Sequence, residues 1–251
     1  MTDKIILVVT FIAFMTGCKA SKTNTIAESN DPIATEVWKP VPIKVTPGAF
    51  NHLAPSDAII LYNGSDLNEW QQLDGREVTW ISSDNELTVK SKSGDIRTKQ
   101  SFGDCQLHIE WKSPNIIEGE GQNRGNSGIF FQDRYEVQVL DNFDNITYPN
   151  GQASAIYKQS IPLVNACKQP GAWQTYDIIY KAPVFDKSGK KVSSAFVTVM
   201  HNGVLTQNHV EIKGTTEYIG YPKNIAHGAA PIRLQDHNSA VGYRNIWIRK
   251  L

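Results

Sequence analysis

Short runs of alternating apolar and polar residues dominate the chain from about residue 58 to its end. Turn signals separate the runs, and Asn202-Gly203 is a strong hairpin signal because both positions accept a positive φ. No stretch combines helical periodicity with caps at both ends. Many short strands without intervening helices predict an all-β domain, a sandwich or a barrel. The runs that fit strands are 59–62, 78–82, 86–90, 95–98, 106–112, 127–131, 135–140, 155–157, 175–181, 195–201, 204–210, 232–235 and 245–249.

Three of these runs carry a polar stripe beside an apolar one. Successive side chains of a strand point to opposite faces, so each polar stripe must face away from the core. A solvated outer face would explain any one stripe, although such faces more often carry Lys, Thr and Ser. Together the stripes indicate a functional surface. Their members are Glu136 with Gln138, His108 with Glu110, and Arg233 with Gln235 and His237.

The first residues read as a targeting segment. Residues 5–15 are apolar apart from Thr10, a run too short to span a bilayer but as long as the apolar region of a signal peptide. The run ends in Met15-Thr16-Gly17-Cys18, which resembles a bacterial lipobox with Cys18 as the lipidated residue. An ordinary secretory signal with a chance cysteine is the alternative. Lys19 after the cysteine favours the outer membrane, facing the periplasm or the cell surface.

Composition changes again after the apolar run. A polar stretch rich in Ser, Thr, Lys and Asn follows Cys18, and prolines punctuate the chain to residue 47. This composition is typical of an extended tether. We therefore predict a lipoprotein signal peptide at 1–17, a flexible tether at 18–54 and one extracytoplasmic domain at 55–251.

Charge and cysteine content exclude some functions. The chain has 25 Lys and Arg residues together and 25 Asp and Glu residues together, so its formal net charge is zero. This argues against a protein that binds nucleic acid through a strongly basic surface. The three cysteines have no zinc-binding spacing. Cys105 and Cys167 are either a disulfide in an oxidising compartment or two buried thiols.

Eight segments in order over about residues 55–251 resemble the 3-keto-disaccharide hydrolase domain family. The resemblance implies a concanavalin-like jelly roll, which is two packed antiparallel sheets, and cleavage of glycosides whose sugar carries a 3-ketone. The segments are LYNGSDLNEW (61–70), NSGIFF (126–131), YEVQVLD (135–141), AIY (155–157), WQTYDI (173–178), NGV (202–204), PIRLQDH (231–237) and RNIWIR (244–249).

The chain departs from the glycosidases that share this fold. Their Glu-x-Asp-x-x-Glu signature is missing, because Gln138 follows Glu136 where an acid would stand. A double-carboxylate site is therefore doubtful on this strand. A 3-ketone makes the proton on C2 acidic, so a base can remove it and the glycosidic oxygen can leave from C1, after which water adds. Such an enzyme needs a base, a stabiliser for the enolate oxygen and an acid for the leaving group.

The candidate site residues follow from that chemistry. Glu136, Glu110 and His237 are the candidate acids and bases, since histidine changes charge near neutral pH. A divalent metal held by Glu, Asp and His could stabilise the oxyanion instead of arginine, but no tight ligand motif commits the chain to one. The candidate substrate-binding residues are Gln138, Arg134, Arg124, Asn126, Gln235, Tyr157 and Trp173.

Two other functions fit parts of the same pattern. A non-catalytic carbohydrate-binding lipoprotein would need the groove and its aromatic side chains but no converging ionisable groups. A structural lipoprotein would need no groove. Tyr157 and Trp173 are either core residues or platforms for a sugar ring. The position of Glu110, Glu136 and His237 relative to one another discriminates between an enzyme and a binding protein.

Overall fold

The computed structural model describes residues 32–251. The predicted signal peptide and Cys18 lie outside the described residues. The compact body is Val45–Leu251. Residues 32–44 are mostly exposed and include one short 3-10 turn, η1 (Pro32–Thr35). Within the described part of the chain, no helix is long and apolar enough to cross a membrane.

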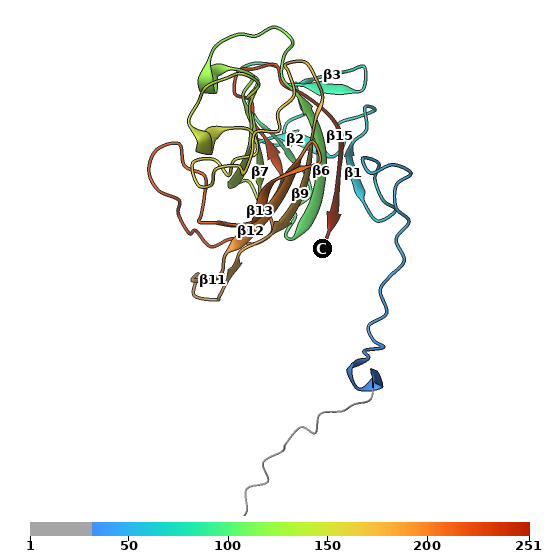
Figure 1. Cartoon of the computed structure of the whole chain (residues 1–251). Coiled ribbons are helices and arrows are strands. Elements are labelled where there is room, and N and C mark those ends of the chain that lie inside the picture. The colour runs from blue at the N-terminus through green and yellow to red at the C-terminus, as the bar shows by residue number, and fades with distance from the viewer. Residues whose placement is uncertain (1–31) are drawn as a thin grey trace, which may run out of the picture. The chain divides into compact units, whose positions relative to one another are not determined.

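The larger sheet has eight antiparallel strands, and we call it sheet A. Figure 1 shows β6, β9, β12 and β13 of this sheet running side by side. The strand β1 (Ile59–Tyr62) pairs with β15 off the main path of the sheet. Along that path the order is β13 (Val204–Ile212), β12 (Ala195–His201), β9 (Gln174–Lys181), β6 (Cys105–Lys112), β15 (Gly242–Lys250), β4 (Glu86–Thr88) and β3 (Ile81–Ser83).

The smaller sheet, sheet B, has five antiparallel strands. Its order is β2 (Trp70–Gln72), β5 (Ile96–Thr98), β14 (Arg233–Leu234), β7 (Ser127–Phe131) and β8 (Tyr135–Val139). A separate hairpin pairs β10 (Val184–Phe185) with β11 (Lys191–Ser193). Two more 3-10 turns, η2 (Gly121–Asn123) and η3 (Pro149–Gly151), complete the elements.

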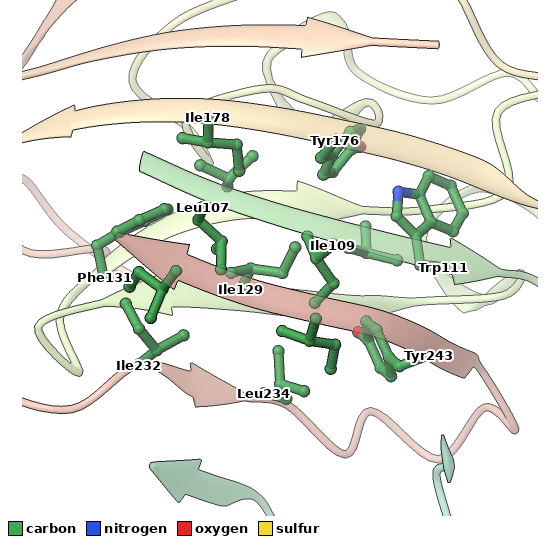
Figure 2. Packing of buried hydrophobic residues seen from close by; sticks show 14 of the residues in the cluster. Leu107, Ile109, Trp111, Ile129, Phe131, Tyr176, Ile178, Ile232, Leu234 and Tyr243 are labelled. Atoms are coloured by element: carbon green, nitrogen blue, oxygen red, sulfur yellow. The ribbon is translucent and has the colours of Figure 1, made fainter. Parts of the chain in front are cut away.

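The two sheets pack face to face around one apolar core (Figure 2). Leu107, Ile109 and Trp111 of β6 point inward from sheet A, and Ile129 and Phe131 of β7 point inward from sheet B. Each is a member of the alternating apolar set in the sequence, so the strand period of two selects the core. The domain is an all-β, two-sheet antiparallel jelly-roll sandwich, as the sequence predicts.

Buried tyrosines tie sheet A to sheet B through hydroxyl hydrogen bonds. Tyr176 donates to Gln138 O at 2.8 Å, and Tyr243 donates to Ser127 Oγ at 2.6 Å. A buried hydroxyl needs a partner, so these bonds select one position of sheet B over sheet A. The strand β8 is thereby fixed from its core side, which positions the residues on its other face.

Most predicted strands are present within one or two residues of their expected ends. The strand β3 begins three residues later than expected and β15 begins three residues earlier. Residues 155–157 form no strand, because Ile156 makes only isolated bridges, to Val137 at the free edge of β8 and to Ser160. The alternation along the chain does not predict β2 or the β10–β11 hairpin.

Residues 45–54, expected in the tether, pack with the body. His52 O accepts hydrogen bonds from Asn245 Nδ2 at 2.9 Å and Trp247 Nε1 at 3.1 Å. Thr46 and Ser56 also exchange bonds across the base of this loop.

Candidate functional site

A polar pocket lies on the outer face of sheet B, the face turned away from the core. Its volume is about 270 Å³. Strands β7, β8 and β14 form the floor, and the chain segments after β8 and β13 form the walls. The lining residues are Asn126, Phe130, Glu136, Gln138, Tyr157, Thr216, Tyr218, Arg233, Gln235 and His237.

Strand register explains which side chains meet on the floor. Glu136 pairs with Phe130, and Phe130 pairs with Arg233, so these three form one row across β8, β7 and β14. Gln138 pairs with Gly128 in the next row of the same face. Gln235 joins that row because its N–H donates to Gly128 O at 3.0 Å. Paired residues of neighbouring strands share a face, so the pairing gathers these residues from distant parts of the sequence.

Glu136 is the buried carboxyl group of this floor, with 4% of its surface exposed. A Cβ added to Gly128 would lie 2.6 Å from Glu136 Oε1, so the carboxyl group lies directly over this glycine. With the Gln138 amide turned so that its nitrogen faces acceptors, it donates to Glu136 Oε1 at 2.8 Å. Glycine therefore makes room for the carboxyl group, and Gln138 holds it in place.

Burial raises the pKa of Glu136 to about 8. The positive charge of Arg233 opposes the shift, and the negative charge of Asp95 reinforces it. Water removed from around the carboxyl group disfavours its charged form, and Arg233 only partly compensates. Glu136 can therefore exchange a proton near neutral pH, unlike an ordinary surface glutamate.

Arg233 is fixed in the floor by two carboxylates and one ring. Its Nη1 pairs with Asp95 and its Nε pairs with Asp133. Its guanidinium carbon lies 3.6 Å from the centre of the Phe130 ring. Charge pairing and stacking both favour one orientation of the planar guanidinium group. The cation is thus held in the same row as Glu136, with Phe130 between them.

Tyrosines and a lysine build one wall of the pocket. The hydroxyls of Tyr157 and Tyr148 are 2.7 Å apart. Lys158 Nζ lies 4.4 Å from the centre of the Tyr218 ring and 5.5 Å from that of Tyr157. Burial raises the pKa of Tyr157, with a further contribution from its hydrogen bond to Tyr148. At the foot of this wall, Thr216 Oγ1 accepts from the Glu136 N–H at 3.0 Å.

The pocket brings six of the predicted site residues together. They come from β8, the residue before β7, the segment that crosses the edge of β8, and the chain that follows β14. The six are Glu136, Gln138, Asn126, Gln235, Tyr157 and His237. Asn126 is buried and donates to Gln122 O at 2.6 Å, whereas His237 is exposed at the mouth. Their catalytic and binding roles stay predictions.

Glu110 is not in this pocket, so the fold brings together only two of the three candidate acids and bases, Glu136 and His237. It belongs to β6 of sheet A and points outward on the opposite side of the sandwich. Arg244 Nε donates to its Oε2 at 2.6 Å, and Asn245 Nδ2 donates to its Oε1 at 2.9 Å. Burial opposes ionisation, but contact with His108 and these two bonds outweigh it and lower the pKa of Glu110 to about 2.

Three other predicted residues also lie outside the pocket lining. Arg124 Nε donates to Asp141 Oδ2 at 2.7 Å in a buried ion pair. Arg134 lies in the turn between β7 and β8, where its Nη1 donates to Gln132 O at 2.8 Å. Trp173 stacks 4.1 Å from the guanidinium carbon of Arg244, beside the Glu110 cluster. None of the three lines the pocket, so we do not place them in the site.

The described residues also bear on a metal site and on a disulfide. Between residues 32 and 251, no group of three or more His, Cys, Asp and Glu side chains is arranged to hold a metal ion. Cys105 and Cys167 are free thiols, which settles the alternative that the sequence left open. Burial raises the pKa of Cys105 to about 12.

Sequence reasoning missed the wall residues Thr216, Tyr218 and Lys158. The alternation around Leu234 placed Arg233 in the polar stripe with Gln235, but the candidate binding residues did not include it. Tyr218 belongs to an irregular loop after β13, and no periodicity marks the direction of its side chain. Only the folded chain places that loop against β8.

Comparison with known proteins gives the chain a family context. Residues 57–249 match the model of the 3-keto-alpha-glucoside-1,2-lyase-like domain. A crystal structure of a protein described as a "putative glycosyl hydrolase", from Parabacteroides distasonis, is 52% identical with a TM-score of 0.85. It covers 88% of this chain and 97% of its own. No match was found among curated proteins.

Two further crystal structures from the same organism, described in the same words, match at lower identity. One is 18% identical with a TM-score of 0.58, covering 78% of this chain and 94% of its own. The other is 20% identical with a TM-score of 0.53, covering 77% and 99%. At these identities the likeness concerns the fold alone.

Proposed function

Because the chain belongs to the 3-keto-alpha-glucoside-1,2-lyase-like domain family, we propose that it cleaves 3-keto-glycosides, including 3-keto-disaccharides, in the pocket on sheet B. The observation that carries the proposal is the buried Glu136 carboxyl group with its pKa raised to about 8. A carboxyl group removed from water, among side chains that can bind sugar hydroxyls, is suited to moving a proton.

Glu136 acts as the base. It takes the proton from C2, which the neighbouring ketone makes acidic, so that the C2–H electrons form a C2–C3 double bond and the carbonyl pair moves onto the C3 oxygen as an enolate. The enolate then re-forms the ketone, and its C2–C3 electrons form the C1–C2 double bond. The bond from C1 to the glycosidic oxygen breaks, and His237 at the pocket mouth gives that oxygen its proton. Water then adds to the double bond, with hydroxide on C1 and a proton returned to C2. No covalent bond to the protein is needed.

Other groups of the floor position the sugar. Arg233 is the cation in the row of Glu136, and it stabilises the enolate oxygen that forms at C3. Gln138, Asn126 and Gln235 supply amide donors and acceptors for the remaining hydroxyls. Glu136 is the one carboxylate among the lining residues of this pocket, which favours elimination over a mechanism with two acting carboxylates.

The test follows the proton on C2. In deuterated water, the wild-type protein should exchange the C2 proton of a 3-keto-glycoside and release the leaving group. Glu136→Gln keeps the volume and the hydrogen-bonding shape, but should lower both rates by about 10²-fold or more. Retention of both rates by Glu136→Gln would show that the base lies elsewhere.

A non-catalytic carbohydrate-binding protein is the alternative. Its binding would rest on the amide side chains and the tyrosines, so Glu136→Gln would leave affinity for a 3-keto-glycoside largely unchanged. The wild-type protein would then show affinity without turnover. A buried group that titrates near neutral pH favours the enzyme, because binding alone does not need one.

Lipid anchoring at Cys18 and an outer-membrane location are also part of the proposal. The support lies in the sequence, where the apolar run at 5–15 ends in Met15-Thr16-Gly17-Cys18 and Lys19 follows the cysteine.

A further inference from the structure

We infer that Tyr218 forms the subsite for the leaving-group sugar, so that the pocket selects glycosides with a second ring. This inference rests on the proposed function of the same pocket. A volume of about 270 Å³ is small beside the roughly 300–1,000 Å³ of pockets that enclose drug-sized ligands. It fits one sugar ring. The second ring of a disaccharide must then lie at the pocket rim.

Tyr218 is the exposed aromatic side chain of that rim. It lines the pocket and is 74% exposed. An exposed tyrosine next to a polar pocket offers a flat apolar surface, which packs well against the apolar face of a sugar ring. The other aromatic side chains of the lining, Phe130 and Tyr157, are only 5% and 9% exposed, so they offer little free ring surface.

Lys158 holds Tyr218 in position. Its Nζ donates to Tyr218 O at 2.6 Å and lies 4.4 Å from the ring centre. The cation therefore occupies one face of the ring and leaves the other for a ligand. Thr216 N donates to Arg134 O, which ties the loop around Tyr218 to the turn between β7 and β8, and Thr215 N donates to Lys223 O across the loop itself, both at 2.9 Å. A platform fixed before binding loses little entropy when a sugar stacks on it.

The same loop provides a matched control. Tyr221 is 90% exposed and does not line the pocket. Removal of its ring changes the apolar surface of the loop by a similar amount without touching the proposed subsite. Tyr218→Phe keeps the ring and removes only the hydroxyl group.

The experiment compares two substrates, a 3-keto-disaccharide and the methyl glycoside of the same 3-keto sugar. Tyr218→Ala should raise KM for the disaccharide about 10-fold, from lost stacking and apolar burial, and should change KM for the methyl glycoside less than about twofold. Tyr221→Ala should match wild type on both substrates, and Tyr218→Phe should restore most of the disaccharide KM that Tyr218→Ala loses, because it keeps the ring. Equal losses on both substrates, or no loss on either, would overturn the inference.

Failure of the proposed function has a different signature, because wild-type protein would then turn over neither substrate. Binding separates the two cases. In protein carrying Glu136→Gln, dissociation constants for the two ligands are measured with and without Tyr218→Ala. If Tyr218→Ala weakens binding of the disaccharide and not of the methyl glycoside, the subsite is supported even without turnover. If the disaccharide binds equally well with and without Tyr218→Ala, the inference is refuted.

Discussion

The buried carboxyl group of Glu136 predicts that the protein loses stability as the pH rises. Its folded-state pKa is about 8, against an ordinary value of 4.5. Between these two values the folded chain keeps a proton that the unfolded chain has released, so each pH unit costs about 1.4 kcal/mol of unfolding free energy. This contribution to stability is complete below pH 4.5 and is lost by about pH 8, a total of about 5 kcal/mol.

Glu136→Gln removes the titration and keeps a neutral side chain of the same size. Near pH 4.5 the variant should be about as stable as wild type, because both carry an uncharged group at this position. At pH 8.5 it should be more stable by an amount that approaches 5 kcal/mol, which is several times a typical mutational effect. The assay is urea unfolding of both proteins at intervals from pH 4.5 to 9, with slopes compared at each pH.

Glu110 provides the control with the opposite sign. Its folded-state pKa is about 2, so its contribution is present above pH 4.5 and is lost as the pH falls toward 2. Glu110→Gln should therefore destabilise the protein at neutral pH, where Glu136→Gln stabilises it. Parallel stability curves for wild type and Glu136→Gln across the whole range would refute the assignment of a buried, proton-binding Glu136.

Turnover of a 3-keto-glycoside should have a rising limb centred near pH 8, because the base Glu136 must be ionised, and a falling limb where His237 loses the proton that it donates; a profile without the rising limb would contradict Glu136 as the base. Gly128→Ala should lower turnover by at least about 10-fold while the protein stays folded, since the new Cβ displaces the carboxyl group from its place 2.6 Å away; unchanged kinetics would contradict this packing. Glu110→Gln should keep turnover within about twofold, measured at a pH where the variant is folded. Cys18→Ala should release the protein from the membrane fraction or stall its processing, and unchanged fractionation together with an unchanged N-terminal mass would exclude lipidation.

Alternation along the strands by itself determines much of the fold. Val137 and Val139 must be buried, so Glu136 and Gln138 must share the opposite face, whatever the partners of the strand. Turn residues such as Asn202-Gly203 then set where β12 ends and β13 begins. These signals are local, and a single sequence carries them in full. For the same reason they do not reveal β2 and the β10–β11 hairpin, whose strands are too short to show a period.

Only the tertiary structure determines which of the two sheets each strand joins. Glu110 and Glu136 have the same local pattern of polar and apolar neighbours, yet β6 lies in sheet A and β8 in sheet B, so the two carboxyl groups point away from each other. Alternation gives the face of a strand but not its sheet, because sheet membership depends on pairing between residues far apart in the sequence. The same long-range pairing set Arg233 in the row of Glu136 and placed the loop of Tyr218 at the pocket rim. It also separated a carboxyl group with a pKa of about 8 from one with a pKa of about 2, since only packing decides which of them loses water and which gains an arginine.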